Sequence, residues 1–372
     1  MKRVWLLLLV ALFISLLSPV QAQDERLTVI GSTTIVADVL QHVAGDAADV
    51  VSLMQYGQNP HTFEPTGQDI ALLDEADVVF VNGAGFEEGL LPVFEEGTNS
   101  TLVEISACVN ILSFGADMHE HEGEDADHDH EGEDADHDHE GEAGEHDHEL
   151  DAACMGYYET LGLELHEDEA HLGMLHEITC GAHEHEDEGA EEEDEHEPGS
   201  CDPHIWTDVQ NVMLWTLYAR DVLSELDPMH ADVYAANAAA YVGELQALDA
   251  EVEAILAPIP EERRVLVTNH QALGYMAYRY DLQMVGTVIP GGSTTAEPSA
   301  EDVAALIEVI EDYGVPAIFT ENIVSNTLAT QIAEATGAQI AQLYTGSLNS
   351  DAPTYVDYMR YNATTIAAAL GE

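Results

Sequence analysis

The stretch PMHADVYAANAAAYVGELQALDAEVEAILA, residues 228–257, decides the fold because it predicts one long helix in the middle of the chain. Its apolar side chains recur at steps that place them along one helical face: Val233, Tyr241, Leu245, Leu248, Val252 and Leu256. At about 1.5 Å per residue, such a helix is about 40 Å long, roughly the width of a small domain. Pro258 and Pro260 end it. We therefore expect a rigid helix that links two lobes.

Strands and helices alternate in the part of the chain that precedes this helix. Short apolar runs such as VVFVN, residues 78–82, fit buried parallel strands. The expected strands are 27–32, 50–54, 78–82 and 101–105, and the expected helices are 35–43, 68–75 and 209–225. This alternation is typical of an α/β lobe, which we place at residues 23–227.

A second alternation follows the helix. Its expected strands are 265–268, 284–288, 317–320 and 339–343, and its expected helices are 299–313 and 327–336. Residues 258–372 therefore form a second lobe. The fold class that we expect is α/β, with two Rossmann-like lobes of parallel strands, the linking helix 228–257, and a ligand-binding cleft between the lobes. Ligands of such sheets bind beyond the carboxyl ends of the strands, so residues just past each strand are the candidate binding residues.

Residues 113–200 interrupt the first lobe with a segment rich in Asp, Glu, His and Gly. The nine-residue unit EGEDADHDH stands twice in succession, at 122–130 and 131–139. Such a composition cannot bury enough apolar surface to fold by itself. Four cysteines lie in or beside the segment: Cys108, Cys154, Cys180 and Cys201. In an exported protein they favour one or two disulfides over a thiolate metal site, and the sequence leaves their connectivity open.

The amino terminus indicates export. Two basic residues precede an apolar run at 4–17, and the triplet VQA at 20–22 is a small-residue cleavage site. Residues 1–22 are therefore expected to be a signal peptide, with an uncleaved anchor as the alternative. The mature chain is expected to be soluble in the periplasm or another extracytoplasmic space. The formal net charge of −65 excludes nucleic acid as a partner and favours cations.

Five histidines lie outside the acidic segment. His42 and His230 fall in or beside helical segments and are expected to be surface or capping residues. His61, His204 and His270 each lie in a loop beside a turn-forming residue, and two of them follow a proline that stiffens the backbone. Neutral imidazole is a preferred ligand of zinc, and three histidines leave a fourth tetrahedral position for water or a carboxylate. We interpret these three as converging metal ligands.

Several motifs resemble those of the substrate-binding proteins of zinc and manganese ABC importers. They are NPHTFEPTGQDIALLDEADVVFVNGAGFEEGL at 59–90, CDPHIWTD at 201–208, TNHQALGY at 268–275, FTEN at 319–322 and APTYVDYMRYN at 352–362. The likeness runs from about residue 27 to the carboxyl terminus and is interrupted by residues 113–200. The first two motifs are the most specific, because they occur in combination.

The resemblance implies a function and a ligand set. A protein of this family holds its metal between two α/β lobes joined by one long helix and passes it to a membrane permease. His61, His204 and His270 fall on the ligand positions of the family. Histidine at the third position is similar to the zinc members, whereas manganese members carry a carboxylate there. We therefore expect Zn²⁺ rather than Mn²⁺ as the transported ligand, an ABC permease as the partner, and a monomer.

The chain departs from the family at the expected fourth ligand. Many relatives place an aspartate in the loop after the last strand, where this chain has Gly346 within LYTGSL. Water, Glu321 or Asp351 remain as candidates. Glu64 and Asp208 are candidates for orienting the imidazoles through their free N–H groups, as carboxylates around metal sites commonly do.

The acidic insertion also resembles the His-rich loop of zinc-uptake members. Its H-x-H units place two imidazoles within reach of one ion, and the surrounding carboxylates raise the local cation concentration. Weak, exchangeable binding is expected at these pairs: His119 and His121, His128 and His130, His137 and His139, His146 and His148, and His183 and His185. The alternative is a solvated acidic linker with incidental histidines.

Two other functions fit parts of this pattern. Three histidines and a water also describe a catalytic zinc site, so a zinc hydrolase with Glu64 or Glu321 as general base is one alternative. A metal buffer or cell adhesin without a permease is the other. The chain lacks the G-x-S-x-G, H-E-x-x-H and G-x-x-x-x-G-K motifs. We therefore expect a binding protein and not an enzyme.

Overall fold

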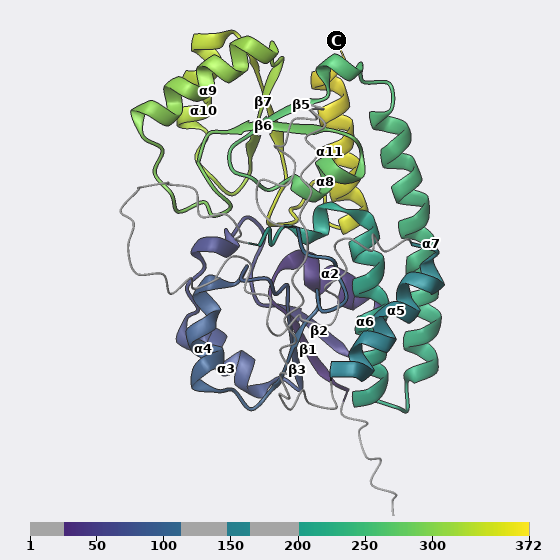
Figure 1. The fold of residues 1–372 in the computed structure, drawn as a ribbon. Helices are drawn as coiled ribbons and strands as arrows, with labels where there is room; N and C mark the ends of the chain where they lie inside the picture. Colours follow the sequence, from purple (N-terminus) through teal and green to yellow (C-terminus); the bar gives the residue numbers. More distant parts are fainter. Residues whose placement is uncertain (1–25, 113–146, 164–200, 372) are drawn as a thin grey trace, which may run out of the picture.

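The computed structural model describes residues 26–112, 147–163 and 201–371, and it confirms the predicted α/β class with two lobes (Figure 1). Each lobe is built on a four-stranded parallel sheet, with the strand orders β2-β1-β3-β4 and β6-β5-β7-β8. In each sheet the first strand in the chain, β1 or β5, lies between two later strands. The direction in which successive strands are added to the sheet therefore reverses at this strand. The carboxyl end of such a strand is a topological switch point, where α/β sheets bind ligands.

The elements of the first lobe are β1 (Thr28–Gly31), α2 (Thr34–Ala44), β2 (Asp49–Ser52), α3 (Gly67–Glu75), β3 (Val78–Val81), α4 (Leu91–Glu96), β4 (Thr101–Glu104), α5 (Asp147–Leu161) and α6 (Val209–Leu226). Those of the second lobe are β5 (Val265–Thr268), α8 (Gly274–Arg279), β6 (Gln283–Thr287), α9 (Ala300–Tyr313), β7 (Ala317–Glu321), α10 (Thr327–Thr336), β8 (Gln339–Leu343) and α11 (Tyr355–Leu370). Helix α7 (Ala231–Leu256) runs along one side of both lobes (Figure 1).

The linking helix is the one expected element whose boundary differs by more than two residues, because α7 begins at Ala231 and not at 228. The preceding residues form a turn in which the backbone N–H of His230 donates to the carbonyl of Asp227 at 3.1 Å. The Asp227 carboxylate also accepts from the Tyr234 hydroxyl at 2.9 Å. This turn occupies the residues that would otherwise form the first turn of the helix.

Helices α4, α5, α8 and α11 have no counterpart among the expected elements. In α11 the buried face includes Tyr355, Tyr358 and Asn362 beside its aliphatic residues. Polar and aromatic side chains on the buried face conceal the apolar stripe by which a helix is recognised in a sequence.

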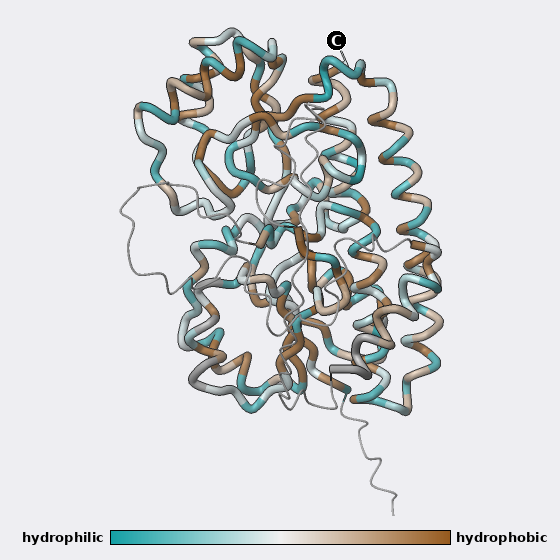
Figure 2. Tube along the Cα trace, viewed as in Figure 1, coloured by the Kyte–Doolittle hydropathy of each residue, from teal (hydrophilic) through white to brown (hydrophobic). Residues whose placement is uncertain are grey.

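One hydrophobic core is shared by the two lobes, and two smaller clusters lie beside it. The shared core contains residues of α2, α6, α7, α8 and α11, and the smaller clusters lie under α3 and α4 and under α9 and α10. The strands are the most apolar parts of both lobes (Figure 2). At the junction, the Tyr355 hydroxyl donates to the carbonyl of Trp206 at 2.7 Å, and the Trp206 indole N–H donates to Tyr358 at 3.1 Å. None of the described helices is long and apolar enough to cross a membrane.

The two ends of the acidic insertion lie side by side. A disulfide joins Cys108 to Cys154 in α5, and Cys201 is also disulfide-bonded. The backbone N–H of Asp202 donates to the carbonyl of Leu112 at 2.8 Å. The backbone bond therefore joins the points at which the insertion leaves and rejoins the first lobe, and the disulfide of Cys108 with Cys154 confirms the expectation of disulfide-bonded cysteines.

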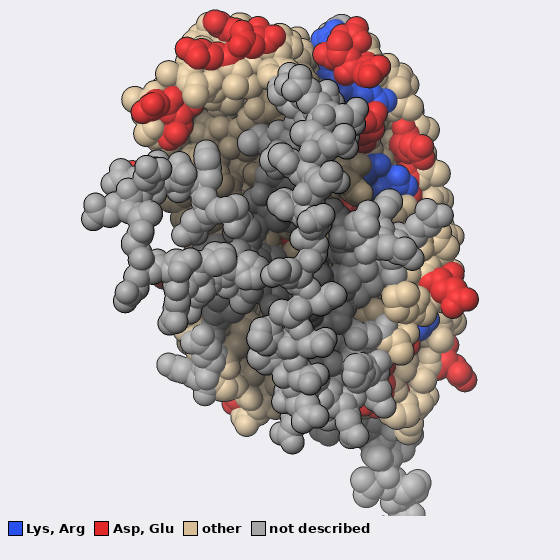
Figure 3. All heavy atoms as spheres, in the orientation of Figure 1, with Lys and Arg blue, Asp and Glu red and all other residues tan. Residues whose placement is uncertain are grey.

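Acidic groups dominate the described surface. Figure 3 shows them over the upper end of the second lobe and along the side that carries α7, with few basic groups between them. Helix α9 alone has five exposed acids and no base: Glu301, Asp302, Glu308, Glu311 and Asp312. Five of the six described arginines pair with acids: Arg26 with Asp49, Arg220 with Asp221, Arg264 with Asp281, Arg279 with Asp249, and Arg360 with Glu251. Most of the negative charge is therefore uncompensated.

Salt is expected to stabilise the folded chain. Raising NaCl from about 0.05 M to about 0.5 M should increase the free energy of unfolding of the metal-free protein by roughly 1 kcal/mol or more, because counter-ions screen the repulsion among the acids. Urea unfolding in the presence of a chelator measures this change. Salt weakens surface pairs such as Arg360 with Glu251, so a net loss of stability would show that ion pairing outweighs repulsion and that the expectation is wrong.

Candidate metal centre

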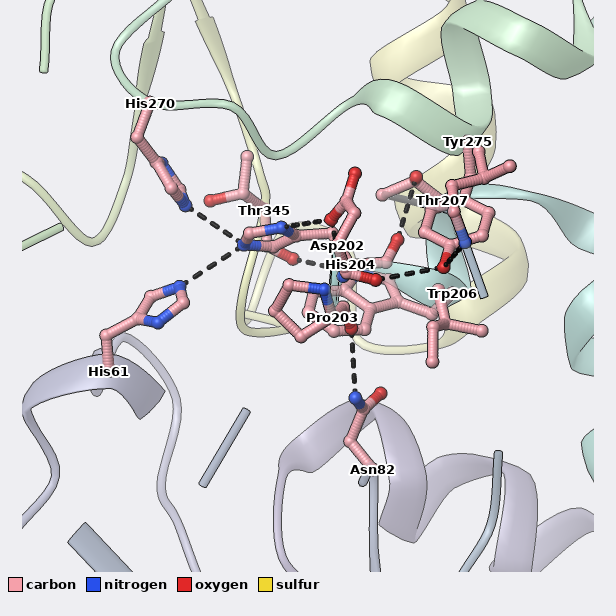
Figure 4. A network of polar contacts seen from close by, with 12 residues as sticks. His61, Asn82, Asp202, Pro203, His204, Trp206, Thr207, His270, Tyr275 and Thr345 are labelled. Atoms are coloured by element: carbon pink, nitrogen blue, oxygen red, sulfur yellow. Dashed lines mark hydrogen bonds and ion pairs between the residues drawn. The ribbon is translucent and has the colours of Figure 1, made fainter. Parts of the chain in front are cut away.

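His61 lies in a short 3-10 turn, Pro60–Thr62, that follows β2. The Asn59 side chain caps this turn by accepting from the backbone N–H of His61 at 3.1 Å. Phe63 packs into the cluster under α3 and α4, and the ring of Phe86 meets the His61 ring edge to face at 5.0 Å. The turn directs the imidazole toward the second lobe (Figure 4).

His204 follows Asp202 and Pro203 in the segment that rejoins the first lobe. The Asp202 carboxylate accepts from both the backbone N–H of His204 at 2.9 Å and its ring Nδ1 at 2.8 Å. The Asn82 side chain donates to the carbonyl of Pro203 at 2.9 Å. Two bonds from one carboxylate fix the orientation of this imidazole.

His270 lies two residues past the end of β5 and is oriented in the same way. Its backbone N–H and its Nδ1 both contact Glu321 Oε1, at 3.0 and 2.7 Å. Glu321 is the last residue of β7, the neighbour of β5, so the sheet itself brings the two side chains together. The other carboxylate oxygen accepts from the Thr345 hydroxyl at 2.7 Å.

The three imidazoles converge through their Nε2 atoms (Figure 4). His204 Nε2 lies 3.2 Å from His61 Nε2 and 3.1 Å from His270 Nε2, and the three atoms all lie within 4.8 Å of one another. The side chains are 5%, 1% and 0% exposed for His61, His204 and His270. A tetrahedral zinc ion with bonds of about 2.0–2.1 Å separates two ligand nitrogens by about 3.3 Å, so the two distances from His204 match those between zinc ligands.

Burial favours the neutral forms of His61 and His204. Loss of solvent, with His204 and His270 nearby, lowers the pKa of His61 to about 2, and burial lowers the pKa of His204 well below its ordinary value. Carboxylate oxygens contact Nδ1 of His204 and of His270, so Nε2 is the ring nitrogen of each that is placed to bind a metal.

The two buried carboxylates differ in charge preference. Burial raises the pKa of Asp202 to about 7, against the backbone hydrogen bond of His204 and the charge of His270. Burial also disfavours ionised Glu321, but the charge and hydrogen bonds of His270 outweigh it and hold the pKa of Glu321 below its ordinary value. A bound cation favours the ionised form of both groups.

The carboxylates predicted as fourth ligands lie elsewhere. Glu321 contacts the Nδ1 side of His270, away from the converging Nε2 atoms, and Asp351 is exposed on a turn capped by Asn349. Gly346 lies where a Cβ would come within 3.0 Å of Pro60, so a larger residue there would have to displace the His61 turn. Among the described residues, only the three histidines contribute atoms to the cluster.

The carboxylates predicted to orient the imidazoles are also placed differently. Glu64 is exposed, and Asp208 caps α6 by accepting from the backbone N–H of Gln210 at 2.8 Å. Asp208 also lies 4.0 Å from Arg279. The orienting carboxylates in the structure are Asp202 and Glu321. The spacing Asp-Pro-His is the signal that would have identified Asp202, whereas the role of Glu321 depends on strand pairing.

The remaining histidines separate into two groups. His42 stacks on Tyr241 with ring centroids 4.1 Å apart, and His230 precedes α7, so neither joins the cluster. Of the ten histidines predicted as weak sites, His148 lies in α5 and the others lie outside the described residues.

The chain resembles known metal-binding proteins over nearly its whole length. The model of a family described as zinc-uptake complex component A, periplasmic, matches residues 29–369. The manganese-binding lipoprotein MntA of Halalkalibacterium halodurans is 26% identical over 352 residues, covering 94% of this chain and 90% of that protein. The iron-binding protein YfeA of Yersinia pestis is 25% identical over 352 residues, covering 94% and 88%. The solved periplasmic zinc binding protein TroA from Treponema pallidum has the same fold, with a TM-score of 0.66, 23% identity, and coverage of 93% of this chain and 100% of that one.

Acid is expected to destabilise the metal-free protein through this cluster. Because the folded state holds His61 neutral down to a pKa of about 2, the unfolded chain binds more protons below pH 6.5, and stability falls as the pH is lowered from 6.5 toward 2. When the pH is lowered from 7.5 to 5.0, the free energy of unfolding of wild type should fall by about 2 kcal/mol more than that of His61→Gln. Urea unfolding with a chelator at both pH values tests this. His42→Gln is the matched control, and an acid loss in His61→Gln equal to that of wild type would contradict the assignment.

Proposed function

Since the chain belongs to this family of zinc-uptake components, we propose that it captures Zn²⁺ outside the cytoplasm and delivers it to an ABC permease for import. Like its relatives, the chain is a substrate-binding protein of a metal ABC transporter. It is not an enzyme. The zinc-hydrolase alternative is therefore set aside. The metal is cargo, and the chemistry required of the protein is selective binding followed by release.

The ligands in this proposal are His61, His204 and His270. The observation that carries it is the convergence of three buried Nε2 atoms, with His204 Nε2 3.2 Å from His61 Nε2 and 3.1 Å from His270 Nε2, while carboxylates contact Nδ1 of His204 and His270. A solvent molecule is the fourth ligand that we propose, because the described carboxylates contribute no atom to the cluster.

The donor chemistry supports zinc over manganese. Three neutral imidazole nitrogens suit a borderline ion such as Zn²⁺, whereas Mn²⁺ prefers sites that include carboxylate and water oxygens. The names of the relatives do not decide the metal, because they refer to manganese, iron and zinc. The selectivity for Zn²⁺ is therefore proposed from the residues of this chain.

The rest of the chain extends the proposal. Residues 1–22 act as the export signal, and the family description as periplasmic agrees with export. The relative MntA is named a lipoprotein, whereas the residue directly after the expected cleavage site here is Gln23 and not a cysteine. The acidic insertion collects zinc at its H-x-H pairs with low affinity. The described residues at its two ends, Leu112 and Asp202, are hydrogen-bonded to each other, and Asp202 orients His204.

A competition titration tests the metal and its ligands. The full mature chain is expected to take one Zn²⁺ from a chelator with roughly nanomolar affinity, because the weak sites of the insertion cannot compete at that level. An excess of Mn²⁺ should not displace it. The triple variant His61→Ala, His204→Ala, His270→Ala should lose this binding, while His42→Ala with His230→Ala, outside the cluster, should keep it. Tight binding that persists in the triple variant would place the site elsewhere.

The orienting carboxylates are expected to matter for affinity. Asp202→Asn and Glu321→Gln should each weaken Zn²⁺ binding by about 10- to 100-fold, because each amide makes a poorer acceptor for the ligand imidazole. The same chelator competition measures the change. Asp208→Asn is the matched control, since asparagine also caps a helix and Asp208 does not touch the histidines. If Asp202→Asn and Glu321→Gln bind Zn²⁺ as tightly as the control Asp208→Asn does, these two carboxylates do not have this role.

A further inference from the structure

The three histidines are supported by different parts of the structure. His204 is followed by Trp206, which is buried in the core shared by the two lobes, and His270 lies beside residues of the same core. The turn that carries His61 is followed by Phe63, which belongs to the separate cluster under α3 and α4, while the His61 ring itself meets Phe86 of the shared core. The position of His61 therefore depends on how this first-lobe segment meets the second lobe.

The Asn59 side chain connects this segment to the second lobe. Its Oδ1 accepts from the backbone N–H of His61 at 3.1 Å, and its Nδ2 donates to the Thr294 hydroxyl at 2.7 Å. Because the amide group is planar and rigid, the two bonds fix the position of His61 relative to Thr294. A second interlobe bond of the segment, from the backbone N–H of Gly57 to Ser347 at 2.9 Å, lies four residues before His61.

Thr294 is itself tied to the other side of the metal cluster. It lies in the connection 288–299 between β6 and α9. In this connection the backbone N–H of Ile289 donates to the carbonyl of Asn269 at 2.7 Å, and Asn269 directly precedes His270. A continuous path of bonds therefore runs from the His61 turn, through Asn59 and the Thr294 connection, to the His270 turn.

We propose that Asn59 and Thr294 form a clasp that holds His61 in the cluster and thereby sets how slowly the metal leaves. Thr294 is a positioning residue in this proposal, because it acts on the metal through Asn59 and His61. The inference rests on the proposed function, since it concerns release of the metal bound by the three histidines.

The clasp is suited to reversible opening. Asn59 and Thr294 are both half-buried, so water can replace their bond when it breaks, and neither group is left unsatisfied in a dry interior. The carboxylate bonds of His204 and His270, in contrast, are buried and costly to break. Opening at the clasp frees His61 first and leaves the other two histidines oriented for the next ion.

The test is the rate at which Zn²⁺ leaves the full mature chain when excess chelator is added in a stopped-flow experiment. Thr294→Val keeps the shape of the side chain and the Asn59 bond to His61 but removes the hydroxyl. We expect dissociation to become about 3- to 10-fold faster, the loss of one hydrogen bond. Ser293→Ala, whose hydroxyl contacts Thr295 in the same connection, is the matched control and should dissociate at the wild-type rate.

A double-mutant cycle separates the clasp from a general loss of structure. In an Asn59→Ala background, Thr294→Val should cause no further acceleration, because its partner is gone. The free energy of unfolding of metal-free Thr294→Val should fall by no more than about 1.5 kcal/mol, the contribution of one hydrogen bond. A wild-type dissociation rate in Thr294→Val, or an equal acceleration in both backgrounds, would overturn the clasp while leaving the metal site intact. Failure of wild type to bind Zn²⁺ tightly would instead overturn the proposed function and the clasp with it.

Discussion

The site depends on three imidazole nitrogens brought within 4.8 Å of one another in the interior. Carboxylates contact Nδ1 of His204 and His270, so the Nε2 atoms of both rings face His61 and each other. Burial disfavours the protonated forms of His61 and His204, which would repel a cation. A positive ion that binds all three nitrogens is the occupant that this arrangement suits best.

Charge balance makes the same centre suited to a divalent ion. Histidine ligands bind a metal as neutral imidazoles, and Asp202 and Glu321 stand directly behind two of them. Two ionised carboxylates would offset the two charges of the ion, so the filled centre carries little net charge into the interior. Buried charges are tolerated when they are paired and hydrogen-bonded, and both carboxylates have hydrogen-bond donors. The carboxylates therefore orient the ligands and also compensate the charge of the cargo.

The two lobes contribute unequally to this centre. The core that runs through α6, α7, α8 and α11 joins the lobes and fixes the relation between His204 and His270. His61 stands on a segment whose Phe63 belongs to a separate small cluster, and polar contacts such as that of Asn59 with Thr294 join this segment to the second lobe. A pair of ligands fixed by the shared core therefore faces one ligand whose segment meets the second lobe partly through polar contacts, which suits both holding and release.

The sequence by itself determined the α/β class, the linking helix, nearly all strand bounds and the three converging histidines, because these depend on local periodicity and on turns such as Asn-Pro-His. It did not determine which carboxylates serve the histidines. Glu64 and Asp208 are close to ligands along the chain, yet one is exposed and the other caps α6. Glu321 reaches His270 from fifty-one residues away because β5 pairs with β7. Gly346 packs on Pro60 across the lobes. Such contacts arise from strand order and interlobe packing, which only the tertiary structure decided.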